Sequence, residues 1–173
     1  MDLSKLTPAD GAVTLRGLER RYRNLFAEAD EHGSPDELAV LPAGNGWTAL
    51  EHIVAAAWDI TAATRALRVV VTEDAPILDP ADVDPAARTR PIKPTGTVHE
   101  RLSQLGLEAT ALADQVVRVP AAAWDRHGLL DDTSNRRVTA LDVLRSAVDS
   151  GVSHLKGAEY VLDEVTQDEQ ARQ

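Results

Sequence analysis

Residues 138–164 carry the clearest helical pattern in the chain, and this pattern limits the folds that the chain can adopt. Apolar or small residues recur every three or four positions, which places them on one stripe of an α-helix. They are Leu141, Leu144, Val148, Gly151, Leu155, Ala158 and Leu162. Thr139 and Asp142 have the spacing of a capping box, in which both side chains bind backbone N–H groups of the first turn. The pattern predicts one long amphipathic helix that packs its apolar stripe against other elements.

Three further stretches have the same organisation, a threonine cap followed by an amphipathic run. The caps are Thr7, Thr48 and Thr97, each with Asp or Glu three residues later. The runs predict helices over about 8–29, 49–71 and 98–116. Aromatic residues make up only 3% of the chain, so a core of Leu, Val, Ile and Ala is expected, which favours helix packing over a β-sandwich. The 173 residues are expected to form a single all-α domain, residues 1–173, a four-helix bundle.

The connections between these helices are predicted to be of unequal length. Residues 72–96 contain five of the nine prolines and cannot hold a regular helix for long. In a bundle this segment would be the long crossover loop that joins two parallel helices, the second and the third. Residues 34–46 and 119–137 are predicted to be loops as well. The tail after Asp163 is polar, and fraying of the helix is expected there.

Charge and composition exclude several classes of function. The formal net charge of −10 argues against a nucleic-acid partner, because phosphate binding needs clustered Lys and Arg. The chain has no cysteine, so it has no disulfide, thiolate metal site or cysteine nucleophile. Its first residues lack the pattern of a signal peptide, and no stretch approaches the ~20 apolar residues of a membrane span. We therefore expect a cytoplasmic protein without a membrane partner.

Two histidines on different predicted helices are the best candidates for a functional site. His52 and His154 lie on the second and the last helix, and a helix bundle builds its sites from side chains on facing helices. Ser150 lies one turn before His154, at a spacing that lets two side chains share a ligand. The structural alternative is that both histidines are hydrogen-bonded residues at the edge of the core. A metal would need a third ligand such as Asp59 or Asp149.

Three motifs give the chain a resemblance to a known family. They are GWTALEHI at 46–53, TALDVL at 139–144 followed by SHL at 153–155, and the Trp124-Asp125-Arg126 loop. With these motifs the chain resembles the DinB/YfiT-like superfamily over nearly its whole length. Actinobacterial branches of that superfamily include mycothiol-dependent maleylpyruvate isomerase-like proteins. The resemblance implies a four-helix bundle that is often a homodimer, with a nickel, zinc or similar divalent ion held by three histidines.

The resemblance places those three ligands at positions where this chain keeps one histidine. One ligand comes eight residues after the motif tryptophan, which is Ala55 here, counting from Trp47. The other two form an H-x-x-x-H pair on the last helix, which corresponds to Ser150 and His154. Neither a methyl group nor a neutral serine hydroxyl replaces imidazole on such a metal. The sequence therefore predicts a degenerate site without a metal, in which His154 and His52 are the only plausible ligands if one binds.

Three functions are compatible with this sequence. The first is a DinB-like bundle, without a cofactor, that binds a small molecule in a pocket lined by residues of both histidine-bearing helices. The predicted lining is His154, Ser150, His52, Ala55 and Trp47. The second is a zinc- or nickel-dependent and thiol-dependent S-transferase or isomerase. The third is an interaction module that forms a homodimer through its helix faces and recognises a partner with residues 72–96. The residues leave open whether the chain is an enzyme.

Overall fold

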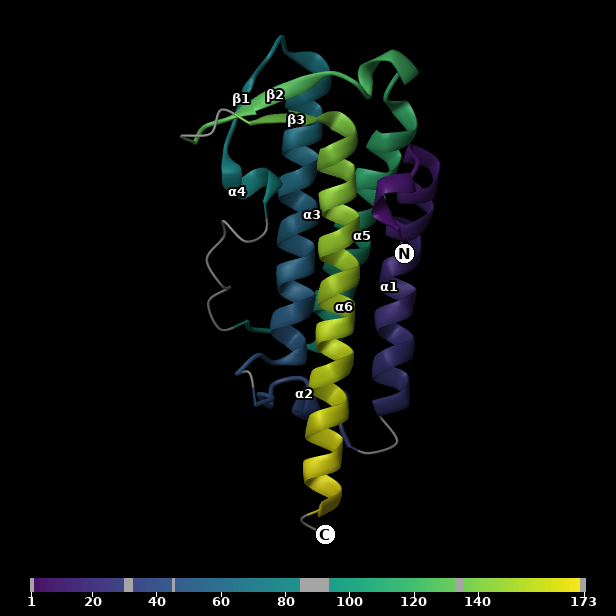
Figure 1. The fold of residues 1–173 in the computed structure, drawn as a ribbon. Coiled ribbons are helices and arrows are strands. Elements are labelled where there is room, and N and C mark those ends of the chain that lie inside the picture. The colour runs from purple at the N-terminus through teal and green to yellow at the C-terminus, as the bar shows by residue number, and fades with distance from the viewer. Residues whose placement is uncertain (1, 30–32, 45, 85–93, 133–135, 172–173) are drawn as a thin grey trace.

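The structure is a computed structural model that describes residues 2–29, 33–44, 46–84, 94–132 and 136–171. Four long helices lie side by side in it (Figure 1). They are α1 (Pro8–Ala29), α3 (Ala49–Thr72), α5 (Val98–Arg118) and α6 (Ala140–Ala171). The predicted all-α four-helix bundle is confirmed. Short helical segments precede or join them, namely η1 (Leu3–Lys5), α2 (Pro35–Leu38), α4 (Pro80–Val83) and η3 (Ala121–Ala123).

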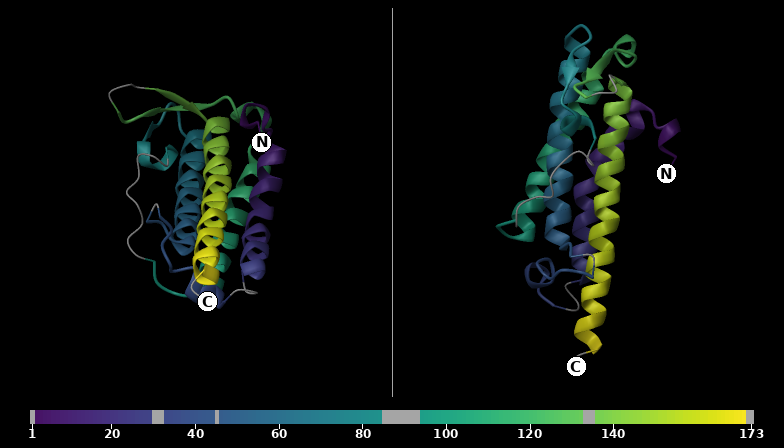
Figure 2. Two further views of the ribbon diagram at one scale, coloured as in Figure 1. Left: turned by 60° about the horizontal axis from the view of Figure 1, so that its bottom comes forward. Right: turned by 60° about the vertical axis from the view of Figure 1, so that its left-hand side comes forward.

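The order and direction of the helices explain the long connection. α3 packs against α5 and α6, and α1 packs against the same two helices from the other side. α3 and α5 run in the same direction, opposite to α1 and α6 (Figures 1 and 2). α5 therefore begins at the end of the bundle opposite to the one where α3 ends, and this confirms the predicted crossover connection. Its described parts include β1 (Ile77–Leu78) and α4.

All four predicted helix starts are present as hydrogen-bonded caps. At α3, Glu51 N–H donates to Thr48 Oγ1 at 3.1 Å, and Thr48 N–H donates to Glu51 Oε2 at 2.9 Å. The same reciprocal pair occurs at α5, where the Thr97 N–H and hydroxyl hold the pKa of the Glu100 carboxyl below its usual range. Thr7 with Asp10 and Thr139 with Asp142 repeat it at α1 and α6. Each pair satisfies N–H groups that have no partner inside the helix.

Alanines and glycines let the helices approach closely. Seven of the fifteen buried residues of α3 are alanines. On α6, Gly151 leaves room for Leu18 of α1, because a Cβ at position 151 would lie 2.9 Å from Leu18 Cδ2. The apolar stripe predicted for the last helix is buried along the bundle axis, with only Leu141 partly exposed.

The structure corrects the predicted connections. The predicted loop at 34–46 contains α2, and the one at 119–137 contains η3, β2 (His127–Leu130) and the beginning of β3 (Arg137–Thr139). β1 pairs with β2 in parallel, and β2 pairs with β3 in antiparallel. The resulting three-stranded sheet covers the end of the bundle at which α3 ends and α6 begins (Figure 1). These strands have two to four residues, which is too short for a periodic pattern to reveal them.

The prediction that the last helix frays after Asp163 was wrong. α6 continues to Ala171 because the apolar stripe continues with the buried side chain of Val165. In addition, Gly44 N–H donates to Glu164 Oε1 at 3.1 Å, which ties the loop before α3 to this part of α6. Among the described residues, none of the helices has the length and apolar character needed to cross a membrane. The cytoplasmic location stays a prediction.

Candidate functional site

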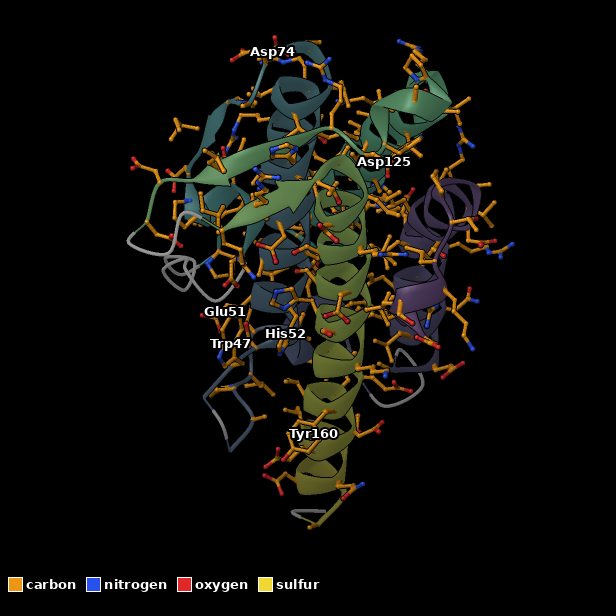
Figure 3. The ribbon with its side chains drawn as sticks, turned by 45° about the horizontal axis from the view of Figure 1, so that its top comes forward. Trp47, Glu51, His52, Asp74, Asp125 and Tyr160 are labelled. Atoms are coloured by element: carbon orange, nitrogen blue, oxygen red, sulfur yellow. The ribbon has the colours of Figure 1, made fainter. Side chains whose placement is uncertain are left out.

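The interface between α3 and α6 brings the predicted site residues together. His52 lies in the first turn of α3, directly after the capping box, and Asp59 lies two turns further along the same helix. Ser150 and His154 face them from α6. Figure 3 shows Trp47, Glu51 and His52 close to one another at the beginning of α3. The site therefore has a rigid base, because all of these residues except Trp47 lie on long helices.

Hydrogen bonds and close polar contacts join four of these side chains into one network. The Nδ1 atoms of His52 and His154 lie 3.0 Å apart, at hydrogen-bond distance. On the other side of its ring, His154 Nε2 lies 3.4 Å from Asp59 Oδ2. Ser150 Oγ donates a hydrogen bond to the same carboxylate oxygen. Ser150 and His154 thus share a partner, as their spacing suggested, and that partner is Asp59.

When Asp59 is ionised and both histidines are neutral, each hydrogen bond between these three side chains has only one possible donor. A carboxylate accepts hydrogen bonds only, so Asp59 favours a proton on His154 Nε2. The Nδ1 atom of His154 is then an acceptor, and His52 Nδ1 must be the donor between the two rings. Donors therefore point from His52 through His154 to Asp59. The arrangement can orient the imidazole of His154 and can balance a proton that it takes up.

The His52 ring is stacked on Trp47 and confined by a glycine. Trp47 stacks on His52 with ring centroids 4.8 Å apart and an angle of 22° between the planes. Trp47 also lies 6.0 Å from the His154 ring. Across the helix interface, a Cβ at Gly157 would lie 2.7 Å from His52 Nε2, which is too close for any side chain. Sequence reasoning missed Gly157, although a glycine inside a long helix often indicates a close approach.

His154 is the member of the network that is most exposed to solvent. His52, Asp59 and Ser150 are 9%, 5% and 6% exposed. The His154 side chain keeps 20% of its surface. His154 is therefore neither on the outer face of the bundle nor sealed in its core, and a ligand that reaches the network would meet it first.

Comparisons with known proteins identify the fold. No protein-family model matches the chain, and no curated protein matches it by sequence. One solved structure that matches is YfiT from Bacillus subtilis, described as "a probable metal-dependent hydrolase with an unusual four-helix bundle topology". The match covers 95% of this chain and 88% of YfiT, with a TM-score of 0.71 and 16% sequence identity. The chain has a YfiT-like fold.

The YfiT-like fold does not by itself supply a metal site in this chain. Of the three positions at which the resemblance places histidines, Ala55 presents a methyl group and Ser150 has its hydroxyl bound to Asp59. Within the described ranges, no group of three His, Cys, Asp or Glu residues is arranged to hold a metal ion. The side chains present therefore do not fit the three-histidine centre. Of the two carboxylates considered as substitute ligands, Asp59 joins the network, whereas Asp149 is exposed on α6.

Proposed function

We propose that this chain is a small-molecule-binding bundle that uses the network of His52, His154, Asp59 and Ser150 in place of a metal centre. The observation that carries the proposal is the convergence of these side chains at the α3–α6 interface, with His154 as the point of access. The other two predicted lining residues lie nearby: Ala55 is in α3, and Trp47, which stacks on His52, comes just before this helix. The proposed binding rests on these side chains, and the likeness to YfiT supports only the four-helix fold that carries them.

The energetics of burial favour a functional role for the network. Taking a carboxylate and two imidazoles out of water carries a desolvation penalty. Apolar side chains of similar size often give equal or higher stability at such positions. The surrounding interface is rich in alanine, so an apolar solution would have been available to this fold. A buried polar network that opens at His154 supports a role in recognition.

The ring arrangement suggests which ligands fit. Trp47 and His154 present partly exposed rings at the same place, so a flat group can stack or pack against them. A polar substituent on that group would then lie close to the imidazole of His154. We infer a flat organic ligand with one hydrogen-bonding substituent.

The test uses four probes with the same ring and different polar substituents: the anion benzoate, the neutral phenol and benzamide, and the cation benzylamine. The side-chain nitrogens of His52 and His154 are observed by ¹H–¹⁵N NMR while each probe is added. At least one probe should shift both signals in the wild type and in the control variant Asp149→Asn, whose substitution lies on the exposed face of α6. His154→Ala should lose binding. If no probe shifts these signals, or if His154→Ala binds as well as the wild type, the proposal fails.

A second candidate is the metal- and thiol-dependent S-transferase or isomerase. One observation favours it: Asp59 contacts the far nitrogen of His154, and a carboxylate in that place commonly orients a metal-bound histidine. YfiT, whose description includes metal dependence, has the same fold. Elemental analysis of protein purified without chelator or affinity-tag metal, with nickel and zinc titrations, distinguishes the two candidates. A stoichiometric metal that is lost in His154→Ala would replace our proposal with this one.

We also propose the predicted homodimer, because apolar side chains are exposed on the helices that would form it. Val13 of α1 and Leu107 and Val117 of α5 each keep more than half of their surface. Light scattering on the purified protein tests the proposal. A dimer in the wild type that becomes a monomer in Leu107→Glu would support it, and a monomeric wild type would refute it.

A further inference from the structure

A hollow lies at the opposite end of α3 from the histidine network. It has a volume of about 650 Å³ and lies where α3 and α5 end, and the loop after α5 forms one of its walls. Asp74 and Asp125 mark this end of the bundle in Figure 3. Its apolar lining consists of Val71, Val119, Pro120, Ala122 and Ala123. The volume is in the range of pockets that hold small organic ligands.

Three arginines line this hollow in a chain whose formal net charge is −10. They are Arg68 of α3, Arg118 of α5 and Arg126 of the loop before β2. None of the described lining residues is acidic. A local excess of guanidinium groups in an acidic protein attracts anions, because the positive potential is concentrated between apolar walls.

Arg126 is held in place by the backbone of α3. Its Nε donates to the carbonyl of Val70 at 3.2 Å, and its Nη2 donates to the carbonyl of Glu73 at 2.5 Å. The contact of Arg126 with Asp74 is long, at 3.4 Å, and that carboxylate is fully exposed. Arg126 thus caps the end of α3, which gives the arginine of the Trp124-Asp125-Arg126 motif a structural role. It also fixes one positive charge at the wall of the hollow.

Capping does not account for the other two arginines in the same way. Arg68 and Arg118 are exposed, and neither forms an ion pair with a carboxylate in the described part of the chain. The negative ends of the α3 and α5 dipoles favour cations here, which explains their position. The N–H donors of both guanidinium groups remain available to a ligand, and guanidinium groups bind carboxylate, sulfonate and phosphate oxygens in a fixed geometry.

We propose that this hollow binds a small organic anion with an apolar body. Arg68 and Arg118 would bind the anionic group, Arg126 would contribute its fixed charge, and the valine, proline and alanine walls would cover the apolar part. Residues 52 and 68 are separated by roughly 24 Å along α3 at 1.5 Å per residue. The site is therefore separate from the histidine network, and either proposal can fail without the other.

The experiment compares two fluorescent probes that differ in their charge. 1-Anilinonaphthalene-8-sulfonate carries a sulfonate, and N-phenyl-1-naphthylamine has the same rings without it. The sulfonate probe should bind the wild type more tightly than the neutral probe. In Arg68→Gln/Arg118→Gln its Kd should rise roughly three- to tenfold, the effect of two partly exposed charge contacts. Arg20→Gln, an exposed arginine on α1, is the matched control and should leave the Kd unchanged.

Additional measurements distinguish binding in the hollow from binding to unfolded protein or to a membrane. Circular dichroism verifies that each variant retains the helical fold, since the sulfonate probe also binds partly unfolded protein. Decanoate, a free anion with an apolar chain, should displace the probe from the wild type. Equal affinity of both probes, or an unchanged Kd in the double variant, would overturn the proposal. Sedimentation with phosphatidylglycerol vesicles that depends on Arg68 and Arg118 would overturn it in favour of a membrane surface.

Discussion

Replacement of Gly157 by alanine tests whether the packing of His52 determines the geometry of the site. In an unconstrained helix interior the substitution stabilises by about 1 kcal/mol, because alanine loses less conformational entropy than glycine. At position 157, however, the new Cβ would lie 2.7 Å from His52 Nε2. Carbon atoms pack at about 3.5 Å from their neighbours. Because Cε1 of the same ring lies still closer to the new Cβ than Nε2 does, the ring must move by roughly 1 Å, away from its present contacts with Trp47 and His154.

The energetic terms predict the sign of the change in stability. Overpacking of a close-packed site costs about 1–3 kcal/mol. Weakening the ring contact with Trp47 and the hydrogen bond to His154 costs roughly 0.5–1.5 kcal/mol each. These losses exceed the gain in helix propensity, so Gly157→Ala should lower the free energy of unfolding by about 1–5 kcal/mol. For a protein of this size the Tm would fall by roughly 2–20 °C.

Gly17→Ala is the matched control, because Gly17 lies inside α1 with a comparable exposure, and no neighbouring atom lies within 4 Å of the place that a Cβ would take there. It should raise the Tm by roughly 2–4 °C. A double variant sharpens the test: in the His52→Ala background the ring is absent, so Gly157→Ala should become stabilising. The measurement is thermal and urea unfolding followed by circular dichroism. If Gly157→Ala stabilises the wild type as much as Gly17→Ala does, the reasoning about this contact is wrong.

Three further predictions concern the caps, the core and the network. Thr48→Ala should lower the free energy of unfolding by about 1 kcal/mol in urea titrations, with Thr48→Ser close to the wild type, because only the alanine lacks the capping hydroxyl. Burial raises the pKa of Tyr22 far above its usual value, so above about pH 10 the unfolded chain loses a proton that the native chain keeps, and stability falls with rising pH. Tyr22→Phe should remove this part of the alkaline loss, measured as unfolding free energy between pH 8 and 11, and an identical pH profile would contradict the assignment. In a double-mutant cycle, Ser150→Ala and Asp59→Ala should show a coupling energy of about 1 kcal/mol or more. Each single change leaves the other side chain buried without its hydrogen bond. Additive effects on the free energy of unfolding would exclude this interaction.

The helices and their starts could be predicted because their causes are local. Thr48 and Glu51 form their capping box within four residues, and the stripe on α6 repeats within each turn. Each such signal is complete before any distant segment is considered. The parallel direction of α3 and α5 also followed from the sequence, since the proline-rich connection between them is long enough to return along the bundle.

The site was predicted only in part because its contacts join distant segments. The sequence by itself determined that His52 and His154 lie on two long helices and that Ser150 lies one turn from His154. Only the tertiary structure decided that Asp59, and not Asp149, joins them, since the angle at which α3 meets α6 selects which face each helix presents. The same packing brings Gly157 against His52 and pairs Ile77 with Leu129 in the small sheet. Such contacts depend on the relative rotation and height of packed elements, which no periodicity within a single element records.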